Sequence, residues 1–326
     1  MLNYIKKRKT LIACCTIIVA IALILSYVTY NKTTTHQFTI GIIQTASHPA
    51  LDATRQGFID YLTEKLGNNK MRFIIKNAQG VPSQAHLIAQ SFQGDEQISG
   101  IFAIATLAAQ AAHQESNSKP LFIAAVTDPA AININPQKDN ACGVPDTIDP
   151  TKQVTLLRAL VPTAKSIVLL YNIGEINAQV STKGLQDAFT KAGYQVELIG
   201  ITQSSDIPLV IDRALQNGDV LMTPLDNMVV GAMPFLAHKA IDARKPLFAT
   251  DNPSVKEGAL AAAGVNYYDL GRQTGTCAFD VLTKKKTAGE IGFLMPIQQF
   301  VVNETTLKKL GLPKPALPSK IIEFVY

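Results

Sequence analysis

No tryptophan occurs among the 326 residues, and cysteine and histidine are scarce, with four and five copies. The cysteines form no Cys-x-x-Cys pair and no Cys/His spacing typical of a metal site, so neither a metal nor a cofactor is expected. Only Cys142 and Cys277 lie beyond the N-terminal apolar run. In an exported chain they would form a disulfide if their backbones approach, and otherwise remain buried free thiols, which is the interpretation we favour.

The motifs of several enzyme classes are also missing. There is no Gly-x-Ser-x-Gly elbow, no GxxxxGK[ST] phosphate loop, no Gly-x-Gly-x-x-Gly after the first expected strand and no His-Glu-x-x-His. His48 and Asp52 would form a general-base pair, but no nucleophile accompanies them in the sequence. A histidine that closes a loop is the better interpretation, and the chain is not expected to be an enzyme.

Charge is sparse outside the N-terminus. Apolar residues make up 47% of the chain and charged residues 17%, as in a folded globular protein. The formal net charge is +5, and it falls to +1 without the basic run at residues 6 to 9. This balance argues against a nucleic-acid partner.

The first 36 residues form a separate segment, in which the basic run precedes an uncharged stretch from Leu11 to Tyr30. That stretch is long enough to cross a bilayer of about 30 Å, with the basic end inside. It is either a cleaved secretory signal or an uncleaved anchor, and the length of the apolar stretch favours an anchor or a slowly cleaved signal. Lipidation at Cys14 or Cys15 is a third, weaker alternative, because no apolar stretch precedes them. The remainder is expected to be exported, periplasmic or at the cell surface.

Apolar strand patterns and amphipathic helix patterns alternate along the rest of the chain. Such alternation predicts an α/β fold with parallel sheets, and about 290 residues suit two doubly wound lobes of roughly 150 residues each. Strands are expected at residues 38–43, 72–76, 100–104, 120–125, 166–171, 195–199, 219–222 and 246–249, and helices at 83–93, 108–115, 156–160, 182–192, 207–216 and 233–243, with another from about residue 49. Between Cys142 and Pro150 the pattern breaks into turn-forming residues, and we expect a boundary there.

The loop after the first strand joins that strand to a helix. Thr45, Ser47 and His48 lie in this loop, next to a helix N-terminus whose free amides favour an anionic group. Helix capping is the alternative role for these side chains.

Five further polar loops follow strands in the same way. Because parallel strands place such loops at one edge of a sheet, we expect them to form two sides of a cleft. Their candidate ligand-binding residues are Thr106, Thr127, Asp128, Tyr171, Asn172, Asp226, Asn227 and Thr250. Each also has a structural interpretation as a cap, a turn residue or a buried aromatic.

Several of these segments together resemble a known family. The segments are residues 48–52 (His-Pro-Ala-Leu-Asp), 55–60, 77–80 (Asn-Ala-Gln-Gly), 105–110, 127–129, 224–227 (Pro-Leu-Asp-Asn) and 269–271. In this order, over roughly residues 38 to 315, they resemble the substrate-binding proteins of ABC transporters of the tryptophan/tyrosine-importer type.

The resemblance implies a periplasmic-binding-protein type I fold with two lobes joined by three crossovers. Lobe 1 would comprise residues 37–146 plus 267–292, and lobe 2 residues 147–266 plus 293–326. It implies an amino acid as the ligand, since several relatives are receptors for aromatic amino acids. It also implies an ABC permease and its ATPase as partners. Many relatives are lipoproteins whose acceptor cysteine follows a full apolar stretch, whereas in this chain Cys14 and Cys15 lie at the start of that stretch.

The resemblance also implies roles for the candidate residues. Thr106 and Thr127 would hold the ligand carboxylate, and Asp226 would balance the ammonium group. Tyr171 would face an aromatic side chain. The polar ring would be completed by Ser47, Asn172, Asn227 and Thr250. A ligand-sensing ectodomain and a receptor for another small solute, such as a purine or a sugar, remain the alternatives.

Overall fold

The computed structural model describes residues 37–115, 118–315 and 322–326. The expected signal, anchor or lipidation segment at residues 1–36 lies outside the described residues. Within the described part, no helix combines the length and apolar character needed to span a bilayer.

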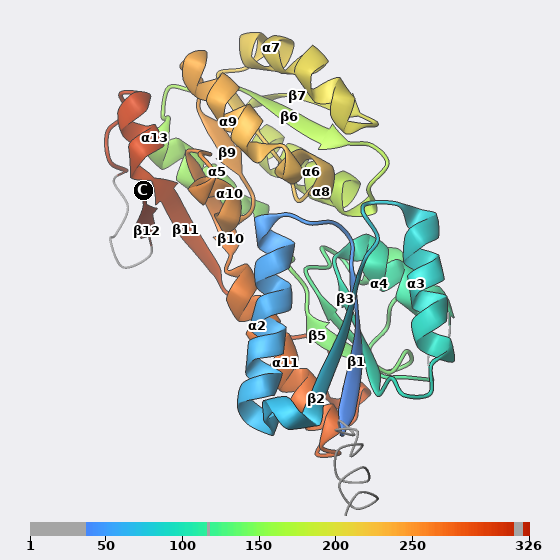
Figure 1. The fold of residues 1–326 in the computed structure, drawn as a ribbon. Coiled ribbons are helices and arrows are strands. Elements are labelled where there is room, and N and C mark those ends of the chain that lie inside the picture. The colour runs from blue at the N-terminus through green and yellow to red at the C-terminus, as the bar shows by residue number, and fades with distance from the viewer. Residues whose placement is uncertain (1–36, 116–117, 316–321) are drawn as a thin grey trace, which may run out of the picture. The chain divides into compact units, whose positions relative to one another are not determined.

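Two sheets organise residues 38–326 (Figure 1). The first has the order β2-β1-β3-β4-β5 and is entirely parallel. Its strands are β1 (Phe38–Gln44), β2 (Met71–Asn77), β3 (Gly100–Ile104), β4 (Leu121–Ala124) and β5 (Ala141–Val144). The apolar composition of β1, β3 and β4 matches their burial on both faces, as parallel strands between helices require.

The second sheet has the order β12-β11-β10-β9-β8-β6-β7 and is parallel except where β10 meets β11. Its strands are β6 (Ser166–Asn172), β7 (Gln195–Ile201), β8 (Val220–Met222), β9 (Leu247–Ala249), β10 (Ala261–Val265), β11 (Gln298–Asn303) and β12 (Ile322–Val325). Each sheet and its helices are called the first and second lobe below. The chain passes between the sheets after β5, after β10 and again before β11.

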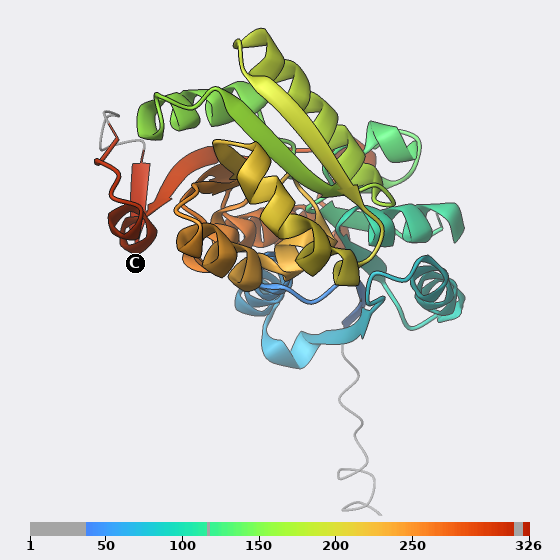
Figure 2. The same cartoon turned by 90° about the horizontal axis from the view of Figure 1, so that it is seen from above.

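Helices cover both faces of each sheet, and each face has its own apolar core. The first lobe contains α2 (Pro49–Leu66), α3 (Pro82–Gly94), α4 (Thr106–Glu115), α11 (Tyr267–Leu282) and α12 (Ala288–Ile291). The second contains α5 (Pro150–Leu160), α6 (Ile176–Lys191), α7 (Ile207–Asn217), α8 (Asn227–Gly231), α9 (Met233–Asp242), α10 (Asn252–Lys256) and α13 (Glu304–Lys309). Short 3-10 turns span Asn68–Lys70, Ala130–Ile132 and Ser204–Asp206. Figure 2 shows the second lobe from above, with α5 and α6 in green shades and α7 and α9 in gold shades on opposite faces of the sheet.

The predicted α/β fold with two parallel-dominated sheets is confirmed, with local corrections. The helix expected at residues 182–192 begins at Ile176. The turn region was expected to start at Cys142, but Cys142 lies in strand β5, which continues to Val144 and pairs with β4 at the edge of the sheet. The strand was not predicted because it is short and contains a glycine. The helix expected at residues 156–160 begins at Pro150, where Asp149 caps it by accepting from the Thr151 amide. The second sheet is mixed, because β11 runs antiparallel to β10.

The two cysteines of the described part are free and buried, as favoured. Cys142 on β5 lies beside Cys277 on α11. Contact with Cys277, and then burial, raises the pKa of the Cys142 thiol, so it stays protonated.

Candidate functional site

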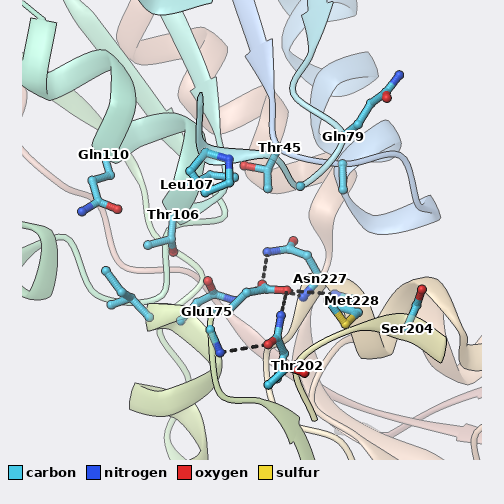
Figure 3. A pocket seen from close by; sticks show the side chains of 17 residues that line it. Thr45, Gln79, Thr106, Leu107, Gln110, Glu175, Thr202, Ser204, Asn227 and Met228 are labelled. Atoms are coloured by element: carbon cyan, nitrogen blue, oxygen red, sulfur yellow. Dashed lines mark hydrogen bonds between the residues drawn. The ribbon is translucent and has the colours of Figure 1, made fainter. Parts of the chain in front are cut away.

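A pocket of about 550 Å³ lies between the two lobes, at the carboxyl ends of the strands. This volume falls within the range of about 300–1,000 Å³ typical of small-molecule sites. Figure 3 shows Thr45, Thr106 and Leu107 on the side of the first lobe, and Glu175, Asn227 and Met228 on the side of the second. The full lining is Thr45, Ala46, Gln79, Gly80, Pro82, Thr106, Leu107, Gln110, Asn172, Gly174, Glu175, Ile176, Asn177, Thr202, Ser204, Asn227 and Met228.

Two backbone positions in the first lobe mark the ends of its central strands. Ala105 follows β3 with φ 72° and Ala125 follows β4 with φ 57°. A non-glycine residue in this left-handed region is strained by about 1–3 kcal/mol, and such strain gathers at functional sites. The turn at Ala105 brings Thr106 to the first position of α4.

Thr106 has a buried hydroxyl at the pocket wall. Its side chain is 3% exposed, and Oγ1 has no hydrogen-bond partner among the described residues. By contrast, the Thr45 hydroxyl donates to the Ile104 carbonyl at 2.9 Å and accepts from the Ala108 amide at 3.1 Å. Thr45 therefore holds the start of α4 against β1, while the Thr106 hydroxyl and the helix N-terminus can receive an anionic group.

Glu175 supplies the carboxylate of the second lobe. Oε2 accepts from the Asn227 amide N–H at 3.0 Å and from its side-chain Nδ2 at 2.7 Å, and Oε1 accepts from the Met228 amide at 3.1 Å. The side-chain amides of Asn172 and Asn177 donate to it as well, at 3.2 and 2.9 Å. Among the described residues, no lysine, arginine or histidine forms an ion pair with this carboxylate. The site thus offers a fixed negative charge to a ligand.

A second, much smaller cavity of about 20 Å³ is lined by residues of both lobes. Its lining combines apolar groups with three buried carboxyl groups, those of Asp146, Asp226 and Asp251. The other polar residues of the lining are His48, Thr127, Asn177 and Tyr267. The Tyr267 hydroxyl donates to Asp146 Oδ2 at 2.8 Å. Burial raises the pKa of Asp146 to about 6, and it also raises the pKa of Asp226 and Asp251.

These raised pKa values predict that the ligand-free protein is more stable at pH 5 than at pH 8. A carboxyl whose folded pKa exceeds its unfolded value stabilises the fold while it is protonated, and that stability is lost as pH rises through the folded pKa. For Asp146, the rise from 3.8 to about 6 corresponds to about 1.4 kcal/mol of unfolding free energy between the two pH values. Urea unfolding at both pH values should show the fall, and Asp146→Asn should reduce it. Equal free energies of unfolding at pH 5 and pH 8 would contradict the raised pKa values of these carboxyl groups.

The structure brings four of the predicted site residues together at the large pocket: Thr45, Thr106, Asn172 and Asn227. Thr127 and Asp226 line the small cavity instead. Both Asp226 oxygens accept from backbone amides, those of Asn172 at 2.5 Å and Val229 at 2.9 Å, so this carboxyl fixes the start of α8.

Four other candidates line neither of these cavities. Ser47 is exposed and accepts from Asn77. Asp128 caps a turn by accepting from the Ala130 amide, and the buried Thr250 hydroxyl donates to the Thr223 carbonyl. Tyr171 is half-buried on β6.

The sequence analysis did not select Glu175, because Glu175 lies three residues beyond Asn172, the last residue of β6. Its signal was available, since it is an acidic residue in a loop that directly follows a buried strand. Gln79 and Gly80 line the pocket and belong to the family-like segment at residues 77–80, but that segment gave them no individual role. Gln110 belongs to the segment at residues 105–110 that follows a predicted strand, but it was given no individual role, and Met228 lies on α8 outside the predicted loops.

The family assignment agrees with this two-lobed site. The model of the ABC transporter substrate-binding protein family matches residues 39–317, and the chain belongs to this family. Its members are solute receptors that act outside the cytoplasm, and they are not enzymes.

Three relatives illustrate the similarity. A tyrosine-binding protein of Clostridioides difficile is 33% identical over 285 residues, covering 85% of this chain and 82% of its own. A Streptococcus pneumoniae ABC domain in complex with L-Trp has a TM-score of 0.82 at 26% identity, covering 89% of this chain and 100% of its own. A ligand-free, open substrate-binding protein from Clostridium difficile has a TM-score of 0.67 at 34% identity, covering 88% and 99%.

Proposed function

We propose that the protein captures an aromatic amino acid in the large pocket by closing its two lobes, and delivers it to an ABC permease. The observation that carries this proposal is the Glu175 carboxylate, which faces the pocket without a cationic partner among the described residues. A charge enclosed in a closed cleft must be paired to offset its desolvation. The α-ammonium group of an amino acid would supply that partner, in the role that the sequence suggested for Asp226.

The carboxylate of the ligand would bind on the opposite lobe. The unpartnered Thr106 hydroxyl and the amides of Thr106 and Leu107, at the start of α4, form the group of donors there. A zwitterion would thus be held by its negative end on the first lobe and its positive end on the second. Because each lobe binds only one end, the ligand favours the closed arrangement.

The apolar part of the lining suits an aromatic side chain. Ala46, Pro82, Leu107, Ile176 and Met228 contribute it. The relatives that bind tyrosine and L-Trp support the same ligand class. A purine or a sugar would leave the Glu175 charge unpaired, which disfavours those solutes.

The arrangement of the lobes also supports closure as the binding step. The structure is more similar to the L-Trp complex than to the open, ligand-free relative, although the open relative has the higher sequence identity. We propose that residues 37–146 with 267–292, and 147–266 with 293–326, move as the two bodies. The crossovers between them would act as the hinge.

A thermal-shift screen of the twenty amino acids tests the proposed ligand class. At 100 times its dissociation constant, a ligand adds about 2.7 kcal/mol to the free energy of unfolding. We expect shifts with tyrosine, tryptophan or phenylalanine and none with aspartate or lysine. Stabilisation by a sugar or a purine alone would overturn the assignment.

We further propose that residues 1–36 keep the receptor at the membrane next to its permease, as an uncleaved helix or a slowly cleaved signal. The basic run and the uncharged stretch that follows support this. Fractionation of cells that produce the full chain should find it with the membrane, whereas a chain that starts at residue 37 should remain in the cytoplasm. Recovery of the full chain only as a soluble exported protein would favour cleavage.

A further inference from the structure

Among the described residues, only one histidine lies between the lobes. His48 precedes α2 in the first lobe and is 7% exposed. It does not cap its own helix with its side chain. Instead, Nε2 lies 3.2 Å from Oδ1 of Asn227, the first residue of α8 in the second lobe.

The orientation of the Asn227 amide fixes the direction of this hydrogen bond. Its Nδ2 donates to Glu175 Oε2 at 2.7 Å, so its Oδ1 is the atom that faces His48. An amide oxygen can only accept, and Nε2 of His48 must therefore carry the proton and donate. A chain of two hydrogen bonds then runs from His48 through Asn227 to the pocket carboxylate.

We propose that His48 is an inter-lobe latch, a positioning residue that holds Asn227, and through it Glu175, in the orientation that a bound ammonium group requires. This inference rests on the proposed function of the large pocket. His48 itself lines only the small cavity and does not touch the ligand site. Because its bond spans the two lobes, it would form on closure and break on opening, and so slow ligand release.

The expected effect of removing His48 follows from the Asn227 side-chain amide, which would lose its hydrogen-bond donor. His48→Ala would leave Asn227 Oδ1 without its donor in the closed state and free the amide to rotate away from Glu175. We expect the dissociation rate of L-tyrosine or L-tryptophan to rise on the order of tenfold, with a smaller change in the association rate. His48→Gln places an amide N–H near the position of Nε2 and should restore most of the loss.

Stopped-flow and calorimetric titrations with L-tyrosine and L-tryptophan test the latch, with melting curves to verify folding. His238→Ala is the matched control, since His238 is an exposed imidazole on α9 that pairs only with Asp242 among the described residues. In an Asn227→Ala background, His48→Ala should cost little more, because the latch acts through Asn227. An equal loss in both backgrounds, or no rescue by glutamine, would overturn the latch in favour of a merely structural role.

Failure of the latch and failure of the proposed function give different results. If the wild-type protein binds none of the three aromatic amino acids, the proposed function fails and the latch falls with it. If the wild-type protein binds one of them and His48→Ala releases it at the wild-type rate, only the latch is overturned.

Discussion

Glu175→Gln is expected to lower the affinity for an aromatic amino acid at least a hundredfold. The substitution removes the negative charge that would face the ligand ammonium while leaving a side chain of nearly the same size. Breaking a buried ion pair by removing one partner costs about 3–5 kcal/mol, and each factor of ten in affinity corresponds to about 1.4 kcal/mol. The measurement is isothermal titration calorimetry with L-tyrosine and L-tryptophan.

The matched control for that experiment is Glu96→Gln. Glu96 is an exposed glutamate in a turn of the first lobe and lines none of the pockets described. Its substitution should leave the affinity unchanged. Melting curves are needed for Glu175→Gln, because the new amide would meet the donors of Asn172, Asn177 and Asn227. A folded Glu175→Gln variant with wild-type affinity would remove Glu175 from the site.

Gly271→Ala is expected to destabilise the first lobe by roughly 3 kcal/mol. Helices α2 and α11 approach so closely that a Cβ on Gly271 would lie 2.0 Å from the Thr54 carbonyl oxygen. On the facing helix, a Cβ on Gly57 would lie 2.1 Å from the Tyr268 carbonyl oxygen. Backbone atoms cannot give way as a flexible side chain can, so the helices would have to separate.

Gly94→Ala in α3 is the control, since no heavy atom lies within 4 Å of its added Cβ. Alanine favours a helix over glycine by about 1 kcal/mol, so the control should be neutral or stabilised in urea unfolding. Equal effects of the two substitutions would contradict the close approach of α2 and α11. A separation of these helices would also displace Tyr267, the first residue of α11, from Asp146.

The sequence was sufficient to predict the architecture because the central strands, such as β3, β4, β8 and β9, are buried on both faces and form short apolar runs. The predicted strand at residues 100–104 matches β3 at both ends. Strand β10 was not predicted, because it consists of alanine and glycine apart from Val265, its one β-branched residue. Helix pairs that are far apart in the sequence, such as α2 and α11, also leave no local sequence pattern that would predict their contact.

The candidate site was predicted in outline but not in its charges. A rule based on strand ends found Asn172, the last residue of β6, and Thr106, two residues beyond the end of β3. It also selected Asp226, whose carboxyl is directed to backbone amides. Whether a carboxylate faces a ligand or a helix end depends on the loop conformation, which single-sequence reasoning does not resolve.

The claim that a zwitterion bridges the lobes is tested most directly by titrating the protein with L-tryptophan and with its two truncated analogues. The chain contains no tryptophan, so any indole emission comes from the ligand alone. We expect L-tryptophan to bind, and both tryptamine, which lacks the carboxylate, and indole-3-propionate, which lacks the ammonium group, to bind at least a hundredfold more weakly. Binding of either analogue with the affinity of the amino acid would contradict the account.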